Sequence, residues 1–454
     1  MVIASIDIQN GKVVQLRQGS ELILQRDNPV ELAEEFDRYG EVAIIDLDAA
    51  MGKSPAGNQA APYNLEMIKP LLRKAECRVG GGIRTPEQAR ELVSLGARKI
   101  IAGSACFRDP AKKGAGISGG EFGVNLPFLE ALSKKIGRER VIAAVDARPS
   151  APEEAGNYEI VVDGWKTPTG LDLVAAARQA EPFVSEFLFT CVDREGTMTG
   201  INREPARRLR EAVSCGLTVA GGVSTLEEVE ALAGLGCDVQ LGMALYTGKL
   251  NLADCFVRSL NWKKGAGIFG GAGVPALLPV IVQSPDGQVL MTGFADTEAV
   301  TETLRRGKVC FHSRSRDKLW MKGESSGHTL SLVRLRADCD RDALLAVAEP
   351  AGPVCHTGAF SCFATDRRYT WDFLQSIIAE RIKTAAPGSY TAALDDELVR
   401  EKIREEAEEL CTAKGHDEVV WEAADLLYFA TVLLTREGVR VEEVLDELDR
   451  RHKK

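Results

Sequence analysis

The sequence repeats itself once, at an offset of about 140 residues, over its first 260 positions. Residues 79–83 (Val-Gly-Gly-Gly-Ile) return as 219–223 (Val-Ala-Gly-Gly-Val), and residues 2–7 return as 141–146. Within each copy, short apolar runs rich in β-branched residues alternate with helical patterns, which is typical of a parallel α/β fold. Two equal halves of four β–α units predict a (β/α)8 (TIM) barrel with a two-fold repeat over residues 1–260.

Polar residues at the ends of predicted strands are the candidates for catalysis, because barrel enzymes use the carboxyl ends of their strands. Asp7 and Asp146 end apolar strands in the first and fifth units. A single aspartate there is more often a helix cap, but two at repeat-related positions favour a pair of one acid and one base. Glycine turns after other strands would expose backbone N–H groups to two phosphates, although each turn alone is weak evidence. They contain Gly81, Gly82, Gly103 and Ser104 in one half and Gly221, Gly222 and Gly242 in the other.

These motifs resemble the ProFAR isomerase family of histidine biosynthesis over almost all of residues 1–260. The resemblance implies an Amadori rearrangement of an aminoaldose to an aminoketose without a cofactor. It gives Asp146 the protonation of the ribose ring oxygen and Asp7 the removal of the C2 proton. Glu195 stands where the family usually has aspartate. Further substrate contacts are implied for Arg84, Arg148, Trp165 and Thr197.

A second group of residues, between positions 338 and 362, has the composition of a metal site. Cys339, Cys355 and Cys362 are spaced by 16 and then 7 positions. Three thiolates suit zinc and leave one tetrahedral position open for water, which implies chemistry. If 338–342 is a strand, its alternation puts three aspartates on one face and Cys339 on the other. The alternative is that these cysteines are buried in a core, as we expect for the other eight.

Residues 277–363 resemble phosphoribosyl-AMP cyclohydrolase, through Ser313 to Arg316, Lys322 to Glu324 and the cysteine and aspartate motifs. The resemblance implies that Cys339, Cys355 and Cys362 bind zinc across a dimer interface. It makes Asp338, Asp340 and Asp342 magnesium ligands and His356 the general base. Residues 292–296 depart from the family, in which many members carry a more apolar stretch ending in Asn. Possible phosphate contacts, which would equally suit a solvated strand face, are Arg314, Arg316 and Lys322.

The last 85 residues are acidic and helical. Residues 370–454 hold 12 Lys and Arg against 20 Asp and Glu, and so carry most of the net charge of −10. An apolar stripe predicts one buried helix face through Ala423, Leu426, Leu427, Ala430, Leu433 and Leu434. An exposed charged face would explain the acids, but their spacing favours a magnesium site made by Glu405, Glu406, Glu409, Glu422 and Asp425. The spacing resembles phosphoribosyl-ATP pyrophosphohydrolase of the all-α MazG-like superfamily.

The whole chain is therefore expected to be multidomain, with the barrel at 1–260, a glycine-rich linker at 261–275, a small α+β zinc domain at 276–366 and the helical module at 370–454. Glycine-rich stretches at 112–120 and 263–271 resemble each other, and the first is a candidate mobile flap. No signal peptide or transmembrane segment is predicted, and eleven cysteines without a disulfide pattern suit a reducing cytoplasm. Nucleic acid and membrane partners are not expected, whereas a homodimer through the two C-terminal domains is.

Three functions follow from these resemblances. The first is a trifunctional histidine-biosynthesis enzyme with Zn²⁺ and Mg²⁺, whose domains catalyse consecutive steps in reverse order along the chain. The second keeps the cyclohydrolase and pyrophosphohydrolase and makes the barrel an inactive scaffold. A third is a non-biosynthetic binding or nucleotide-housecleaning protein. Whether the barrel also isomerises phosphoribosylanthranilate, the related tryptophan-pathway aminoaldose, is open at this stage.

Overall fold

The computed structural model describes residues 1–17, 21–52, 64–108, 122–150, 157–264, 275–385 and 388–452. The chain divides into two compact units, Met1–Val282 with Thr292–Gly352, and Gln283–Met291 with Pro353–Lys454. The glycine-rich stretch 112–120 lies outside the described residues, and of 263–271 only Lys263 and Lys264 are described. The flap prediction therefore falls outside the described part of the chain.

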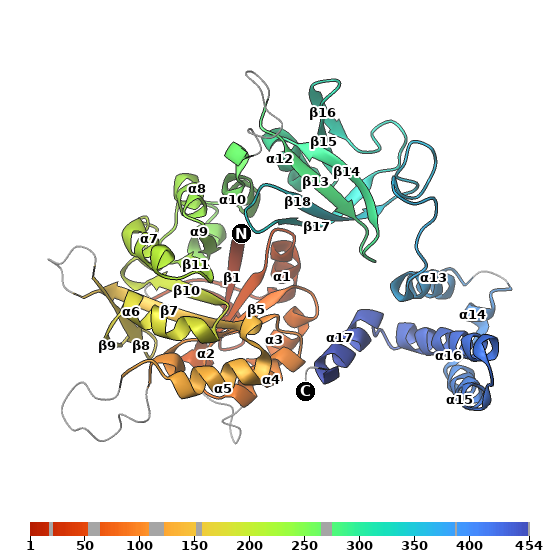
Figure 1. Ribbon diagram of the computed structural model, residues 1–454, viewed down its shortest axis with the longest axis horizontal. Coiled ribbons are helices and arrows are strands. Elements are labelled where there is room, and N and C mark those ends of the chain that lie inside the picture. Colours follow the sequence, from red (N-terminus) through yellow and green to blue (C-terminus); the bar gives the residue numbers. More distant parts are fainter. Residues whose placement is uncertain are drawn as a thin grey trace. The chain divides into compact units, whose positions relative to one another are not determined.

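Eight parallel strands close into a barrel in the first unit (Figure 1), as the repeat predicts. The last strand returns to the first through the pairing of Val239 with Val2. Their side chains are almost all buried because helices cover the outside of the sheet. In barrel order the strands are β1 (Val2–Gln9), β4 (Val42–Asp46), β5 (Cys77–Gly80), β6 (Lys99–Ala102), β7 (Val141–Pro149), β10 (Glu186–Cys191), β11 (Gly216–Ala220) and β12 (Asp238–Leu241).

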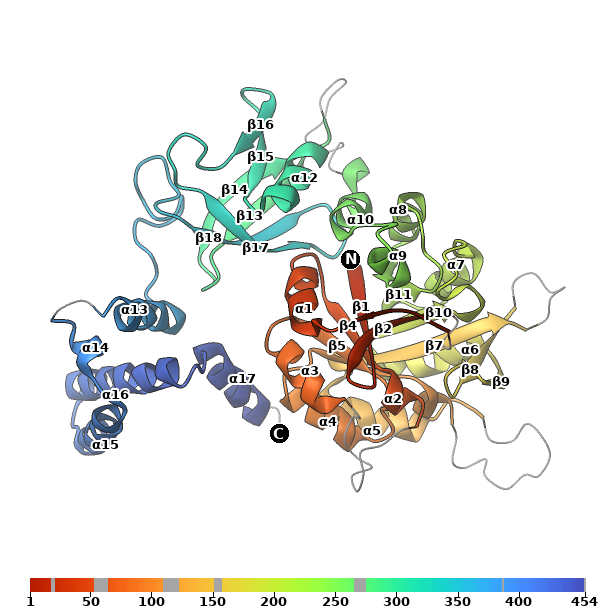
Figure 2. The same ribbon diagram turned by 180° about the vertical axis from the view of Figure 1, so that it is seen from behind.

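Helices surround the strands (Figures 1 and 2), and the two halves begin equivalent helices in the same way. Thr85 and Thr225 each cap a helix, and Gln88 and Glu228 complete the two capping boxes. Antiparallel hairpins extend β1 and β7, so the two-fold repeat includes β2 (Lys12–Arg17) with β3 (Glu21–Arg26) and β8 (Tyr158–Val162) with β9 (Thr167–Asp172). The helices are α1 (Pro29–Asp37), α2 (Leu47–Ala50), α3 (Leu65–Leu72), α4 (Pro86–Ser94), α5 (Leu126–Ile136), α6 (Leu173–Ala180), α7 (Arg203–Ala212), α8 (Leu226–Gly234), α9 (Met243–Tyr246) and α10 (Leu252–Ser259).

The barrel interior is apolar toward the carboxyl ends of the strands and charged toward their amino ends. Ile101, Ile142, Ala144, Leu188 and Ala220 form an apolar cluster separate from the larger core between strands and helices. Below it, the fully buried Arg78 guanidinium contacts the carboxylates of Glu41 and Glu186, and Lys99 Nζ lies 3.0 Å from Glu186 Oε2. The ion pairs and hydrogen bonds within this cluster offset part of the cost of removing its charges from water. This cluster closes the amino-terminal end of the barrel.

A mixed α+β segment follows the barrel, and all of it except Gln283–Met291 belongs to the first unit. Its four-stranded sheet has the order β14-β13-β18-β17, and a separate hairpin pairs β15 with β16. Within this unit, Leu335 N donates to Arg38 O at 2.9 Å, and Arg334 and Arg336 form ion pairs with Asp37. The segment therefore attaches at the amino-terminal end of the barrel. Its elements are β13 (Leu278–Gln283), β14 (Val289–Ala295), α12 (Thr297–Arg306), β15 (Cys310–Ser313), β16 (Lys318–Met321), β17 (Leu330–Ala337) and β18 (Leu344–Pro350).

The second unit is helical after residue 370, with α13 (Trp371–Thr384), α14 (Tyr390–Ala393), α15 (Asp396–Thr412), α16 (His416–Arg436) and α17 (Val441–His452). The prediction of which face of α16 is buried, made from the apolar stripe, is wrong for the single chain. Leu427 is 48% exposed, whereas Phe429 and Val432 are the buried residues that join the core with Ile378. The stripe misled because the two faces of α16 are both largely apolar. No helix among the described residues is long and apolar enough to cross a bilayer.

Candidate active sites

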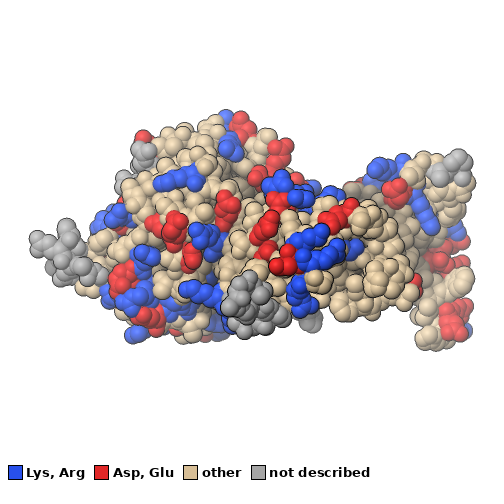
Figure 3. All heavy atoms as spheres, turned by 90° about the horizontal axis from the view of Figure 1, so that it is seen from above, with Lys and Arg blue, Asp and Glu red and all other residues tan. Residues whose placement is uncertain are grey.

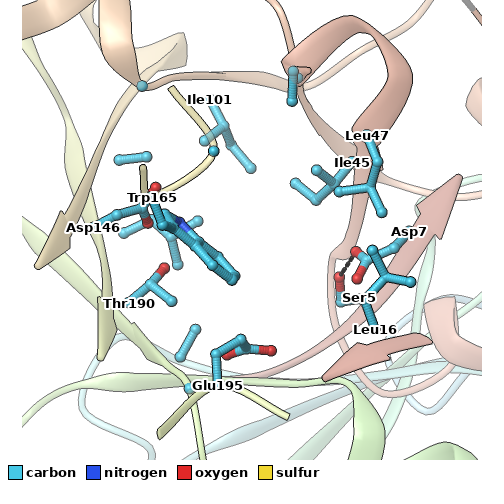
Figure 4. Close-up of a pocket in the computed structure, with 18 of the residues that line it drawn as sticks. Ser5, Asp7, Leu16, Ile45, Leu47, Ile101, Asp146, Trp165, Thr190 and Glu195 are labelled. Carbon is cyan, nitrogen blue, oxygen red and sulfur yellow. Dashed lines mark hydrogen bonds between the residues drawn. The ribbon is translucent and has the colours of Figure 1, made fainter. Parts of the chain in front are cut away.

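A cavity of about 890 Å³ opens at the carboxyl ends of the barrel strands. Asp7 and Asp146 face each other across it, and Glu195 lies between them at its edge (Figure 4). Ile101, Leu188 and other residues of the interior apolar cluster also line it. The cavity is therefore polar at its walls and closed below by apolar side chains, which favours strong electrostatic interactions with a bound substrate.

Asp7 lies near the end of β1 and is half-buried, with its side chain facing the cavity. Burial raises the pKa of Asp7 to about 6, and a hydrogen bond from Ser5 partly opposes that rise. The Ser5 hydroxyl donates a hydrogen bond to Asp7 Oδ1 at 2.7 Å. The sequence did not indicate this role for Ser5. A carboxylate with a pKa just below neutrality is suited to removing a proton at physiological pH.

Asp146 occupies the equivalent position on β7. Burial raises its pKa, and hydrogen bonds with Thr190 and Trp165 act in the opposite direction. Trp165 lines the cavity from a loop in which three successive residues have positive φ, namely Asp163 (57°), Gly164 (64°) and Trp165 (70°). Backbone strain of this kind persists where surrounding contacts fix a loop, and it is common at active sites.

Glu195 is the third carboxyl group of the cavity. Burial, and then the negative charges of Asp7 and Asp146, raise the pKa of Glu195 to about 8. Its Oε2 would lie 3.2 Å from a Cβ built on Gly221, so the carboxyl group lies beside the second glycine turn. At neutral pH this group is mainly protonated and can donate a hydrogen bond, while Asp7 is mainly ionised.

The glycine turns approach the cavity closely. A side chain at Gly81 (φ 104°) would meet Asp46 O at 2.2 Å, and one at Gly221 (φ 93°) would meet Cys191 O at 2.7 Å. Only glycine allows this approach, which leaves the backbone of each turn open to the cavity. The other predicted residues that line the cavity are Gly82, Arg84, Gly103, Ser104, Trp165, Gly222 and Gly242.

Two predicted substrate contacts lie elsewhere. Arg148 pairs with Glu159 on β8, with 3.1 Å between Nε and Oε1. Thr197 donates its hydroxyl to Arg194 O at 2.7 Å. Neither residue is among those that line the cavity, so their contact with substrate stays a prediction.

The three aspartates of the α+β segment come together in a turn and not in a strand, so the strand expectation is wrong. β17 ends at Ala337, and Arg341 has a φ of 63°, which breaks any alternation. Asp338 Oδ1 accepts hydrogen bonds from the N–H groups of Asp342 at 2.9 Å and Ala343 at 3.1 Å. One oxygen from each of Asp338, Asp340 and Asp342 lies within 4.8 Å of the others. An aspartate side chain that accepts hydrogen bonds from backbone N–H groups of its own turn holds that turn closed. The three carboxylates are thereby brought together.

A cation fits this aspartate turn. Lys264 Nζ forms ion pairs with Asp340 and with Asp342, the latter at 2.8 Å. Its hydrogen bond lowers the pKa of Asp340. The lysine ammonium therefore lies among carboxylate oxygens, which are the type of ligand that hard cations such as Mg²⁺ prefer.

The three cysteines predicted as zinc ligands belong to different units. Cys339 is exposed in the first unit, whereas Cys355 and Cys362 belong to the second. Thr357 donates to Cys355 Sγ at 3.1 Å and lowers the pKa of that thiol, as does a hydrogen bond with Cys362. His356 is exposed, with Nδ1 3.8 Å from Cys355 Sγ. None of the three cysteines is buried, which argues against the core alternative; the other eight are mostly buried, as expected.

The predicted phosphate contacts of the α+β segment differ in exposure. Arg314 and Arg316 are exposed in the turn between β15 and β16, and the Arg314 guanidinium lies 3.9 Å from the centre of the Phe294 ring. Lys322 is instead buried, with Nζ 3.5 Å from His328 O. The solvated strand alternative therefore does not describe Lys322.

Sequence reasoning also missed a buried histidine. His312 Nδ1 lies 2.7 Å from Asp296 Oδ2, and Nε2 lies 3.1 Å from Asp317 Oδ1. Asp296 is the residue at which the segment departs from its family, and its other oxygen caps α12. A histidine bound on both ring nitrogens is fixed in orientation, which explains why Asp suits this position.

The acidic helices bring carboxylates together across α15 and α16. One oxygen from each of Glu406, Glu409 and Glu422 lies within 4.8 Å of the others. Desolvation, and then the charges of Glu409 and Asp425, raise the pKa of Glu406. Glu405 instead forms an ion pair with Lys402, with 2.6 Å between Nζ and Oε2. Carboxylates that raise one another's pKa are suited to binding a divalent cation.

The fold and the cavity define a (β/α)8-barrel enzyme for a small phosphorylated substrate, joined to two further domains with clustered carboxylates. A family model described as histidine biosynthesis protein matches residues 1–251, which is more than half of the chain. The chain belongs to this family. Models described as phosphoribosyl-AMP cyclohydrolase and phosphoribosyl-ATP pyrophosphohydrolase match residues 291–364 and 372–452. The chain thus carries the ProFAR isomerase, cyclohydrolase and pyrophosphohydrolase domains of histidine biosynthesis in this order.

Similar proteins match the C-terminal part of the chain. A histidine biosynthesis bifunctional protein HisIE from Xanthomonas campestris is 43% identical over 202 residues, which are 43% of this chain and 94% of that protein. The HisIE proteins of Bacillus subtilis and Escherichia coli are 42% and 41% identical, and cover 39% and 43% of this chain and 91% and 96% of their own lengths. Most of each relative thus corresponds to less than half of this chain.

Proposed function

We propose that all three domains are active. The chain would convert phosphoribosyl-ATP into the isomerised bisphosphate PRFAR in three reactions, one at the active site of each domain. The helical module would cut phosphoribosyl-ATP, the α+β domain would open the adenine ring, and the barrel would isomerise the product. The observation that carries the barrel assignment is the pair of aspartates, Asp7 and Asp146, that line one cavity from equivalent strands. The proposed domains keep their predicted limits at residues 1–260, 276–366 and 370–454.

In the barrel, proton transfer needs one group that gives a proton and one that takes it. Burial favours the protonated form of Asp146, which suits it to protonating the ribose ring oxygen and so opening the ring. Asp7, with its pKa near 6, would then remove the C2 proton. The backbone of Gly81 and Gly82 would bind one phosphate and that of Gly221 and Gly222 the other.

Glu195 and Arg84 complete this proposed site. A protonated Glu195 would donate a hydrogen bond to the substrate without repelling the phosphate beside Gly221. Arg84 lines the same cavity, and its guanidinium matches the oxygens of the first phosphate.

In the α+β domain, we assign zinc to Cys339, Cys355 and Cys362 and magnesium to Asp338, Asp340 and Asp342. Zinc would supply an activated water, and His356 would accept the proton of that water. Members of this family are generally metal-dependent. The clustered carboxylates support magnesium, and three thiols that lie outside the core support zinc. Arg314, Arg316 and Lys322 would contact the substrate phosphates.

In the helical module, Glu406, Glu409, Glu422 and Asp425 would bind magnesium, with Glu405 held nearby by Lys402. The ion would neutralise the pyrophosphate leaving group. A homodimer in the cytoplasm is the proposed setting, since Leu427 and Trp421, which is 70% exposed, give α16 an apolar surface that a second copy would cover.

The test supplies the intact chain with phosphoribosyl-ATP, zinc and magnesium, and separates and weighs every product. Each variant should stop the sequence at its own substrate: Glu409→Gln at phosphoribosyl-ATP, Cys362→Ser at phosphoribosyl-AMP and Asp7→Asn at ProFAR. We expect Asp7→Asn to slow isomerisation by about 10²- to 10⁴-fold. A wild-type barrel that converts ProFAR no faster than Asp7→Asn would make it a scaffold. Broad hydrolysis of ordinary nucleoside triphosphates without a ring-opened product would instead support a housecleaning enzyme.

A further inference from the structure

We propose that Arg341 is a positioning residue, through which the amino-terminal end of the barrel holds the aspartate turn of the cyclohydrolase in its metal-binding shape. Arg341 lies inside the Asp338–Asp342 turn but directs its guanidinium away from the three aspartates and into the barrel. The proposal rests on the magnesium site assigned above and adds a role for the barrel that does not involve its own cavity.

The guanidinium of Arg341 is almost completely buried against the barrel. Nη1 donates to Ala233 O at 2.7 Å, and Nη2 donates to Cys237 O at 2.7 Å and to Asp238 Oδ1 at 3.1 Å. Ala233 lies in the last turn of α8, where the helix dipole favours a positive charge, and its carbonyl also accepts the N–H of Gly236 at 2.9 Å. Only 11% of the Arg341 side chain is exposed.

The backbone of the turn is held from the same side. Asn261, which follows α10, donates its N–H to Arg341 O at 2.8 Å. Arg341 itself takes up a left-handed conformation (φ 63°) that disfavours non-glycine residues, so its contacts must offset this cost. Because Arg341 lies between Asp340 and Asp342, fixing its backbone and side chain fixes the direction in which both carboxylates leave the turn.

The position of the contact separates this role from isomerisation. Asp238 begins β12 at the amino-terminal end of the barrel, whereas Asp7 and Asp146 line the cavity at the carboxyl end. Residues that orient metal ligands without touching the metal commonly change its affinity by 10- to 100-fold. A loosened aspartate turn should therefore bind a divalent cation more weakly while the isomerase keeps its activity.

The experiment measures Mn²⁺ binding to the full chain by electron paramagnetic resonance of the free ion. All proteins carry Glu409→Gln to remove the helical carboxylate site. The Mn²⁺ binding that Asp340→Asn abolishes is the binding at the aspartate turn. Arg341→Ala should weaken the affinity of that binding about tenfold. Arg341→Lys, which keeps the charge and one donor group, should restore part of the affinity. Asp238→Asn, which leaves both carbonyl acceptors in place, should have a smaller effect than Arg341→Ala.

Arg334→Ala is the matched control, because Arg334 also pairs with the barrel, through Asp37 and Glu76, but lies outside the turn. It should change Mn²⁺ affinity by less than twofold. The inference is overturned if Arg341→Ala binds Mn²⁺ as the parent does, or if Arg334→Ala weakens binding equally. If Asp340→Asn does not raise the signal of free Mn²⁺ above that of the parent, the proposed magnesium site fails first. ProFAR isomerase turnover at parental rate in Arg341→Ala establishes that the barrel is folded, and loss of that turnover would also overturn the inference.

Discussion

Glu195 shows how one side chain can make stability depend on pH. Its folded-state pKa is raised to about 8, so the folded protein holds this proton more tightly than the unfolded chain. For an acid with a raised pKa, the free energy of unfolding falls as pH rises from the unfolded pKa toward 8, and then stays constant. Burying the charge is thus destabilising at alkaline pH.

We expect Glu195→Gln to remove this loss, because the amide is neutral at every pH. Its Tm should exceed that of the wild type by about 4 °C or more at pH 9, and the two should agree at pH 5. Thermal unfolding of the barrel transition at both pH values gives the measurement. Glu204→Gln, an exposed change on α7, serves as the control. Equal Tm differences at both pH values would show that Glu195 is not protonated in the folded state.

The acid limb of the isomerase rate should report Asp7. Its pKa is raised to about 6, and the base must be ionised, so kcat/KM should fall tenfold per pH unit below about 6. Ser5→Ala removes a hydrogen bond that stabilises the carboxylate and should move this limb to higher pH. A limb that stays in place in Ser5→Ala would contradict the assignment of Asp7 to it.

At the scale of elements, the aspartate turn shows where prediction from sequence ends. The spacing Asp338, Asp340, Asp342 identified a group of carboxylates, and the three do come together. The strand invoked to align them was wrong, because the turn depends on contacts with a segment 100 residues earlier in the chain, at Ala233 and Cys237. Similarly, the stripe on α16 was visible, but which face the other helices cover was not.

Lys264 competes with any cation that binds this turn. Lys264 and Asp340 are about half exposed, at 48% and 49%, whereas Asp342 is 17% exposed, so water and salt weaken the ion pair with Asp340 more than the one with Asp342. We expect Lys264→Met to tighten Mn²⁺ binding by about two- to fivefold in the Glu409→Gln background. Lys263→Met, a neighbouring exposed lysine, should leave the affinity unchanged. Weaker binding in Lys264→Met would mean that the lysine supports the turn and does not oppose the ion.

At the scale of the whole molecule, we expect the proposed zinc site to combine residues of two chains. If Cys339 of one chain meets Cys355 and Cys362 of another, a mixture of Cys339→Ser and Cys355→Ser chains restores one intact site in each mixed dimer. Random pairing should then recover about a quarter of wild-type cyclohydrolase activity, although each variant alone has none. Mixing Cys339→Ser with Cys339→Ala gives no intact site and is the control. Recovery no greater than this control would place all three thiols in one chain.

Charge on the whole molecule was only partly informative. Most of the net negative charge lies in residues 370–454, yet over the described residues on the face drawn in Figure 3 basic and acidic side chains are interspersed. The barrel was predictable because its repeat consists of short motifs that can be recognised in the sequence. The location of the active site at the carboxyl ends of the strands then followed from the fold. The buried cluster around Arg78 and the attachment through Arg341 were not, since both join residues far apart in the chain.

The two ends of the barrel have different roles. The catalytic cavity lies at the carboxyl end, and the α+β segment attaches at the amino-terminal end. An enzyme built in this way can acquire an attached partner without any change in the loops that surround its own substrate. Substitutions that alter the isomerase and substitutions that alter the join then fall on separate sets of residues.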